Sequence, residues 1–266
     1  MDTTTSTGPI KELLFSGAMG CVIYQMGYAQ SLLEILGRDH LKQYKIGGVS
    51  AGSAAAGYLF CAIHSDYDLK YFYQNSTRKF YEPPNKKYYG LFTNGSLMLG
   101  LCREHWNFCR ELNIPHHNGN YHLYVTVFDH LGFEKQLVDS FEGPDDFAQA
   151  MHASCYLPAI TGFGLYTSFR GKKAFDGGLT MPIPYKYEDS EKIFINILPQ
   201  SFYSWPVVKE WPKNLTMLNI QNEFELKFPM DYFPWKETWS DEMFLKGYLA
   251  GIKGREEIEK IFKKGQ

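Results

Sequence analysis

The chain has 266 residues and a formal charge of −2, with 44% hydrophobic and 21% charged residues. It lacks the basic excess of nucleic-acid-binding proteins, so we expect no nucleic-acid partner. It also lacks an apolar run of about 20 residues that could span a bilayer, and its first eight residues do not resemble a signal peptide. These features predict a cytoplasmic protein, with residues 1–10 as a flexible tail and residues 11–266 as one domain.

The first predicted elements alternate between strand and helix. An apolar run at 12–16 predicts a strand, and apolar residues at helical spacing from Val22 to Leu36 predict a helix, with Gly37 in the position of its C-terminal cap. Residues 44–48 predict a second strand, and a helix of small residues follows Ser50 to about His64. This order is typical of a parallel sheet with crossover helices.

The rest of the chain predicts a mixture of helices, hairpins and strands. Residues 66–120, rich in Tyr and Phe, predict helices and loops that lie over the sheet. Alternation of apolar and polar residues at 122–129 and 133–140 predicts a hairpin. Pro144 is expected to begin a helix that ends before Pro158. Ser240 is expected to be the N-cap of a last helix, in which Gly247, Gly251 and Gly254 are unfavourable. The expected strands are 122–129, 133–140, two strands within 166–178, 192–199 and 215–220.

The second strand-to-helix turn contains the pattern G-x-S-x-G, as Gly48-Val49-Ser50-Ala51-Gly52. A serine at such a turn has a strained backbone and an exposed hydroxyl, which is the geometry of a nucleophile elbow. The flanking glycines remove the Cβ atoms that would collide as strand and helix approach each other. The helix N-terminus adds free N–H groups and partial positive charge beside the hydroxyl. Ser50 is therefore a candidate nucleophile, whereas a simple glycine-rich turn is the alternative.

Two further segments supply the remaining groups that acyl transfer needs, a base and donors for an oxyanion. The turn Gly17-Ala18-Met19 after the first strand offers three backbone N–H groups as oxyanion donors. The segment Asp176-Gly177-Gly178 offers an acid at a strand end, followed by glycines that let other backbone approach closely. The three segments together predict an acyl-transfer site.

The identity of the base depends on the histidines. In an α/β-hydrolase a histidine would follow the acid, but no histidine follows Asp176. A triad would need His152 together with an earlier acid such as Asp129 or Asp139. His152 lies in the middle of a predicted helix, where a packed or surface residue is the simpler interpretation. A Ser50–Asp176 dyad therefore fits the sequence better.

Four segments of the chain resemble the patatin-like phospholipase family in their order and spacing, namely 13–32, 46–59, 148–162 and 175–184. The resemblance extends from about residue 12 to 255. It implies a three-layer α/β/α fold, with a mostly parallel central sheet and helices on both faces. It also implies hydrolysis of acyl esters of glycerolipids, with Ser50 in the place of the nucleophile and Asp176 in the place of the dyad acid.

The sequence departs from the family in the oxyanion turn, which commonly reads G-x-G-x-x-G. Gly17 is kept, but the next glycine position holds Met19, and Gly20 follows one residue later. The backbone N–H groups survive this change, because every residue except proline has one. The open question is whether Met19 adopts the backbone conformation that glycine allows.

No metal or organic cofactor is expected. The five cysteines are scattered and odd in number, which is typical of reduced thiols. Cys109 with His116 and His117 is the nearest approach to a zinc site, but such sites need four ligands. Asp66 and Asp68 alone are too few for a calcium loop.

The expected partner is a lipid, met by transient contact at a membrane or lipid-droplet surface. Aromatic residues make up 17% of the chain, and many lie among prolines at 201–211 and 228–239. Packing over the core is one interpretation of these segments, and contact with an acyl chain or a lipid interface is the other. Two rival functions remain open: a serine esterase or thioesterase with a histidine base, and a lipid-binding pseudoenzyme on the same scaffold.

Overall fold

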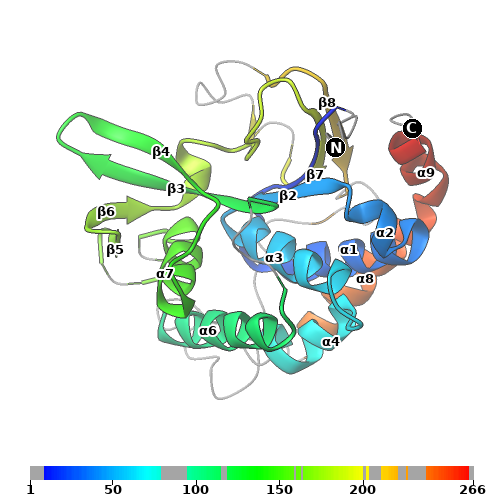
Figure 1. Cartoon of the computed structure of the whole chain (residues 1–266), viewed down its shortest axis with the longest axis horizontal. Coiled ribbons are helices and arrows are strands. Elements are labelled where there is room, and N and C mark those ends of the chain that lie inside the picture. The colour runs from blue at the N-terminus through cyan, green and yellow to red at the C-terminus, as the bar shows by residue number, and fades with distance from the viewer. Residues whose placement is uncertain are drawn as a thin grey trace, which may run out of the picture.

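The computed structural model describes residues 9–78, 95–114, 119–158, 160–162, 164–199, 202–203, 211–220, 226 and 238–263. Within these residues, one mixed sheet has the strand order β5-β6-β3-β2-β1-β7-β8, with β4 paired to β3 (Figure 1). The predicted α/β class is therefore confirmed. The strands are β1 (Lys11–Phe15), β2 (Tyr44–Val49), β3 (Tyr121–Asp129), β4 (Gly132–Val138), β5 (Thr167–Phe169), β6 (Lys172–Phe175), β7 (Glu191–Asn196) and β8 (Leu215–Asn219).

The centre of the sheet is parallel, because β8, β7, β1, β2 and β3 pair in the same direction. The residues of β1 from Glu12 to Phe15 are fully buried, as expected for a strand covered on both faces. Phe15 lies beside Gly48 in the register of β1 and β2. The turns that follow these two strands therefore lie next to each other at one edge of the sheet.

Helices pack in layers beside the sheet (Figure 1). The crossover helices α1 and α3 contact each other, α7 contacts β3, and α6 packs on α7. A short 3-10 helix, η1, spans Met19–Cys21, another, η4, spans Gly177–Leu179, and a π-helix, η2, spans Tyr73–Thr77. The α-helices are α1 (Val22–Leu36), α2 (Arg38–Leu41), α3 (Ala51–Ile63), α4 (Leu69–Phe72), α6 (Gly95–Glu111), α7 (Pro144–Ser154), α8 (Trp239–Lys253) and α9 (Arg255–Lys263).

Glycines let α1 and α8 approach closely. A Cβ atom on Gly27 would lie 2.0 Å from the carbonyl oxygen of Phe244, and one on Gly247 would lie 2.0 Å from that of Tyr24. A Cβ on Gly251 would lie within 1.6 Å of Ser31 Oγ. Glycine has a low helix propensity, but at these positions it permits backbone contact between two helices. Gly247 and Gly251, which seemed unfavourable in the sequence, are therefore required by packing, whereas Gly254 ends α8.

The last helix differs from the prediction in two ways. The structure has two helices, α8 and α9, which are separated at Gly254. Ser240 is not the N-cap, because α8 begins at Trp239 after Thr238, and Ser240 lies buried in the first turn. Packing of Trp239, which is 4% exposed, extends the helix beyond the start that the serine suggested.

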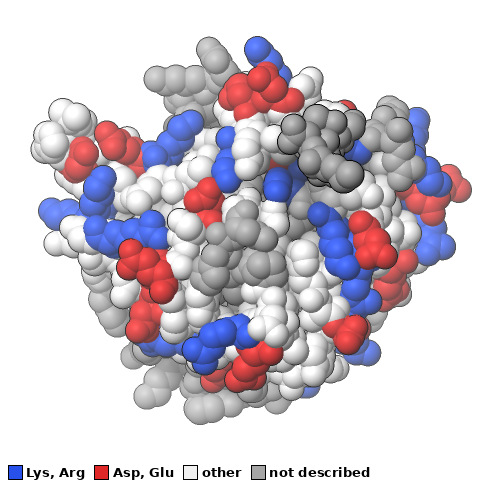
Figure 2. All heavy atoms as spheres, in the orientation of Figure 1, with Lys and Arg blue, Asp and Glu red and all other residues white. Residues whose placement is uncertain are grey.

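The surface carries both signs of charge. Figure 2 shows Lys and Arg interspersed with Asp and Glu over the face drawn, in agreement with the small net charge. Among the described residues, no helix has both the length and the apolar character needed to span a bilayer. The predicted tail is described only from residue 9, and most of the aromatic segments at 201–211 and 228–239 also lie outside the described residues.

Candidate active site

Ser50 lies between β2 and α3 in a strained backbone conformation, with φ of 55° and ψ of −138°. Positive φ is uncommon for a residue with a side chain. A Cβ on Gly48 would lie 2.4 Å from the carbonyl oxygen of Gly52, and a Cβ on Gly52 would lie 2.1 Å from that of Ser16. Both glycines of the motif are therefore required for the turn to close.

Asp176 meets Ser50 from the other half of the chain. It follows β6 directly, and the hydroxyl of Ser50 donates a hydrogen bond of 2.6 Å to its Oδ2 atom. The backbone N–H of Gly178 donates a bond of 2.8 Å to its Oδ1 atom. The carboxylate thus has one oxygen on the serine and the other fixed by η4, which it caps.

Burial controls the charge of Asp176. The residue is 5% exposed, and this burial raises the pKa of its carboxyl from 3.8 to about 6. The hydrogen bonds from Ser50 and Gly178 lower the pKa and oppose part of that rise. A carboxyl with a pKa near the working pH can accept and return a proton, as a general base must.

Buried groups that the sequence analysis did not identify hold these two residues in place. Ser154, on α7, accepts a hydrogen bond of 3.0 Å from the backbone N–H of Ser50 and donates one of 2.7 Å to the carbonyl of Tyr124. Thr126, on β3, donates a 2.7 Å bond to the carbonyl of Asp176. Ser154 lies within the segment 148–162 quoted above, but its hydroxyl carries no local signal of a role.

The predicted oxyanion turn lies against the serine. A Cβ on Gly17 would lie 3.4 Å from the Cβ of Ser50 and 3.9 Å from its Oγ. Met19 has a φ of 49°, so it adopts the left-handed conformation that glycine favours. The turn is fixed by Gln25, whose Nε2 donates to the carbonyl of Ser16 at 3.0 Å. The substitution of methionine for glycine therefore leaves the turn in a glycine-like conformation.

The histidine alternative has no support in the hydrogen bonds of the described residues. His152 Nδ1 lies 3.3 Å from Thr167 Oγ1, and neither Ser50 nor Asp176 bonds to a histidine. Asp129 accepts from the N–H of Leu131, and Asp139 pairs with Lys186. Neither acid that we considered for a triad is hydrogen-bonded to His152. The pKa of His152 is lowered by burial.

A group of possible metal ligands lies away from Ser50, at the end of α3. Cys61, His105 and Cys109 are buried, and their ligand atoms lie within 4.8 Å of one another. A structural zinc site has four protein ligands, and the described residues supply three at this place. His116 and His117, considered above with Cys109, lie outside the described residues.

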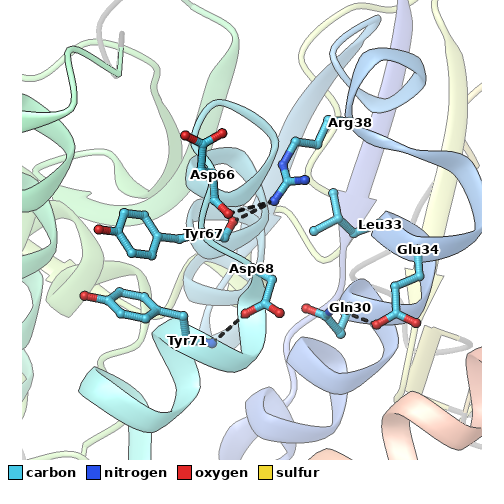
Figure 3. Close-up of a pocket in the computed structure, with 8 residues that line it drawn as sticks. All are labelled: Gln30, Leu33, Glu34, Arg38, Asp66, Tyr67, Asp68 and Tyr71. Atoms are coloured by element: carbon cyan, nitrogen blue, oxygen red, sulfur yellow. Dashed lines mark hydrogen bonds between the residues drawn. The ribbon is translucent and has the colours of Figure 1, made fainter.

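The hollow drawn in Figure 3, of about 520 Å³, is lined by residues of α1, α2, α4 and the segment between α3 and α4. Its polar groups stabilise the local fold. Arg38 donates to the carbonyl oxygens of Ala62, Asp66 and Tyr67, and Asp68 accepts from the N–H of Tyr71. Because Ala62 is near the C-terminus of α3 and Ser50 precedes its N-terminus, the hollow is about 20 Å from the serine. It is not part of the candidate active site.

A small apolar cavity lies closer to the serine, between α3, α6 and α7. Its volume is about 30 Å³, and its lining includes Ala54, Gly57 and Met151. Ala54 is one helical turn beyond Ser50. The cavity has room for about one water-sized group. An acyl chain would enter it only if a neighbouring helix moved.

Comparison with known proteins places these features in a family. A family model described as "Patatin-like phospholipase" matches residues 13–189. The mouse protein named omega-hydroxyceramide transacylase (Mus musculus) is 24% identical over 180 residues, which cover 66% of this chain and 28% of that protein. The human protein of the same name (Homo sapiens) is 23% identical over 170 residues, which cover 64% of this chain and 30% of that protein. The chain thus matches less than a third of the length of these relatives.

Two solved structures are also similar. The crystal structure of VipD from Legionella pneumophila has a TM-score of 0.48 and 12% identity, and covers 94% of this chain and 67% of that one. The type III effector ExoU has a TM-score of 0.48 and 16% identity, and covers 95% of this chain and 54% of that one.

Proposed function

The chain belongs to the patatin-like phospholipase family, and from that premise we propose that it cleaves acyl esters of phospholipids or other glycerolipids. Ser50 is the nucleophile and Asp176 is the base. The observation that carries the proposal is the hydrogen bond of 2.6 Å from the Ser50 hydroxyl to the Asp176 carboxylate, at a turn where Ser50 has a φ of 55°. A nucleophile and a base within hydrogen-bond reach of each other are the signature of covalent catalysis.

In the first step, the Oγ of Ser50 attacks the acyl carbonyl carbon while its proton passes to Oδ2 of Asp176. The tetrahedral intermediate collapses, the protonated Asp176 returns the proton to the leaving alcohol, and the acyl group stays on Ser50. The same carboxylate then takes a proton from water as this water attacks the acyl-enzyme, and it returns the proton to Oγ of Ser50 as the fatty acid leaves. The pKa of about 6 supports this double role, because both protonation states of Asp176 are accessible near neutral pH.

The tetrahedral intermediate carries a negative charge on its oxygen, which hydrogen-bond donors must stabilise. We propose that the turn Gly17-Ala18-Met19 supplies these donors. The N–H of Ser50 itself is already bonded to Ser154, so it is not a free donor. The closeness of Gly17 to Ser50 supports the backbone N–H groups of residues 17–19 for this task. Oxyanion donors of this kind typically contribute about 10²–10³-fold to the rate.

The substrate is a lipid, so the protein must meet a lipid surface. We propose that it acts in the cytoplasm and contacts membranes or lipid droplets transiently. An acyl chain that followed α3 from Ser50 toward α6 and α7 would need one of these helices to move, because the apolar cavity next to Ala54 has a volume of only about 30 Å³.

Acyl transfer is the second candidate function. The curated relatives are named as a transacylase, and an acyl-enzyme can react with a lipid alcohol in place of water. The dyad would then deprotonate the alcohol by the same route. Product analysis separates the two, because transfer yields a new ester whereas hydrolysis yields a free fatty acid.

The test uses purified protein, its Ser50→Ala variant and a panel of phospholipids, triacylglycerols and short-chain esters, with and without a long-chain alcohol. We expect the parent to release fatty acid or to form a new ester, and the variant to do neither. Labelling with a fluorophosphonate separates an enzyme from a pseudoenzyme. A parent protein that neither cleaves an ester nor takes up the label would refute the proposal.

A further inference from the structure

The hairpin of β3 and β4 projects from one end of the sheet (Figure 1). Strand register assigns its side chains to two faces. Phe128 pairs with Phe133 and with Lys173, and Thr126 pairs with Lys135 and with Phe175, so these residues share one face. The opposite face carries Val125, Val127 and Ala174, which are buried, on strands that α7 contacts. We call the first set, together with Leu131 at the turn and Tyr166 before β5, the outer face of the hairpin.

The outer face carries a cluster of apolar side chains that are open to solvent, although Thr126 at its inner end is buried. Leu131 is 79% exposed, Phe133 59%, Tyr166 46% and Phe128 39%. The ring of Phe133 packs edge-on against those of Phe128 and Phe175, at centroid distances of 5.1 and 5.2 Å. Exposed apolar residues that cluster in this way mark an interaction site, whereas single ones do not. The outer end of the hairpin is uncharged surface in Figure 2.

The charges of the outer face are positive. Lys135 and Lys173 share it with the aromatic rings, and Lys173 Nζ lies 4.9 Å from the centroid of Tyr166. The nearby carboxylate of Glu134 belongs to the other face, because Glu134 pairs with Val127. The carboxylate of Asp129 is bonded to the N–H of Leu131 within the turn. Aromatic rings flanked by lysines suit the boundary of a bilayer with anionic headgroups.

The outer face leads directly to the candidate active site. Phe175 is one of its residues, and Asp176 is the next residue in the chain. Leu179, three residues beyond Asp176, is 46% exposed at the end of η4. A surface that held these residues at a bilayer would bring the Ser50–Asp176 pair to the lipid.

We propose that the outer face of the hairpin docks the protein onto bilayers that contain anionic phospholipid, with Leu131, Phe133 and Phe128 in the headgroup region and Lys135 and Lys173 on the phosphates. This inference rests on the proposed function and names the surface that meets the lipid. The alternative occupant is a second copy of the chain. Protein–protein interfaces bury about 800 Å² on each partner, which is more than these few side chains at the end of a hairpin offer.

The experiment measures binding to vesicles by flotation, in a Ser50→Ala background so that the lipid is not degraded. Vesicles of phosphatidylcholine alone are compared with vesicles that contain phosphatidylserine as well. We expect Leu131→Ser/Phe133→Ser to weaken binding to both by about 10-fold or more, because two apolar side chains leave the lipid. Lys135→Gln/Lys173→Gln is expected to remove the preference for phosphatidylserine.

The matched control is Leu245→Ser/Leu249→Ser, which removes two apolar residues on α8 that are 54% and 38% exposed. It is expected to bind vesicles as its parent does. The proposal is overturned if the hairpin variant Leu131→Ser/Phe133→Ser binds vesicles as well as the parent does. It is also overturned if the control variant loses as much vesicle binding as the hairpin variant. A dimer that only the hairpin variant disrupts, with vesicle binding unchanged, overturns it as well.

A second readout separates this proposal from the proposed function. With Ser50 restored, the hairpin variant is expected to hydrolyse a monomeric, water-soluble ester as fast as the parent and to lose activity on vesicles. A parent that binds vesicles but cleaves no ester contradicts the proposed function and leaves the docking surface standing. A hairpin variant that retains full activity on vesicles contradicts the docking surface alone.

Discussion

Replacing Asp176 with asparagine is expected to stabilise the protein while it abolishes activity. Burial raises the pKa of the Asp176 carboxyl from 3.8 to about 6. At ~1.4 kcal/mol per pKa unit, this shift corresponds to about 3 kcal/mol of folding free energy. The folded state binds the proton of Asp176 more tightly than the unfolded state does. The protonated carboxyl therefore contributes its full stability to the fold below about pH 4, and this contribution is lost as the pH rises through 6. At pH 7 the ionised carboxylate therefore costs the fold about 3 kcal/mol.

Asparagine keeps the shape of this side chain without the charge, and its amide can still bond to Ser50 and Gly178. The assay is urea unfolding of both proteins between pH 4 and pH 7. We expect Asp176→Asn to be more stable than the parent by up to about 3 kcal/mol at pH 7, with the difference vanishing toward pH 4.

The matched control is Asp146→Asn. The pKa of the Asp146 carboxyl is lowered, mainly by its hydrogen bond from Arg170, so its charge stabilises the fold. The contribution of this charge to stability is present above the pKa that the carboxyl has in the unfolded state, and it is lost in acid. Asp146→Asn is therefore expected to destabilise the protein at pH 7. The inference would be wrong if Asp176→Asn were less stable than the parent at pH 7 and the difference in unfolding free energy between the two proteins were the same at pH 4. In that case the buried charge of Asp176 would not destabilise the fold.

Three further outcomes follow from the site and the fold. The kcat/KM of the parent is expected to rise about tenfold per pH unit below pH 6 and to level off above it, because only the ionised Asp176 accepts a proton; a profile without a step near pH 6 argues against this base. Ester hydrolysis is expected to persist in EDTA, and a loss that calcium reverses would contradict the dyad. Gly247→Ala is expected to lower the free energy of unfolding by more than ~1 kcal/mol, because its methyl group would collide with the backbone of α1. Gly100→Ala, with open space around it, is expected to raise the free energy of unfolding by ~0.5–1 kcal/mol. Equal effects of the two variants in urea unfolding would refute the packing argument.

The sequence predicted those parts of the site that depend on local geometry. The glycines at 48 and 52 indicated a tight strand-to-helix turn, and the structure shows the collisions that a side chain at either position would cause. Local pattern also gave the strands and the hairpin within a few residues. The proximity of Asp176 to Ser50 could not follow from local pattern, because 126 residues separate them. It was expected because no histidine follows Asp176, and because the chain resembles a family with a Ser–Asp dyad.

Features that depend on tertiary contacts were missed. Ser154 has no local signal, since its hydroxyl matters only because α7 places it between Ser50 and Tyr124. The glycines of α8 looked unfavourable because the approach of α1 cannot be read from one helix alone. The outer face of the hairpin was also not foreseen. Alternation separates Phe128 from Val127 along β3, but only the position of α7 shows which of the two faces is covered.

The rate at which a fluorophosphonate labels Ser50, followed by mass spectrometry of the intact protein and its peptides, tests the central claim most directly. The parent, Asp176→Asn and His152→Ala are compared under one condition, with circular dichroism to confirm that each is folded. We expect His152→Ala to be labelled at Ser50 at the parent rate and Asp176→Asn to be labelled about 10²–10⁴-fold more slowly, because the base is lost. Rapid labelling of Asp176→Asn together with no labelling of His152→Ala would contradict the Ser50–Asp176 dyad.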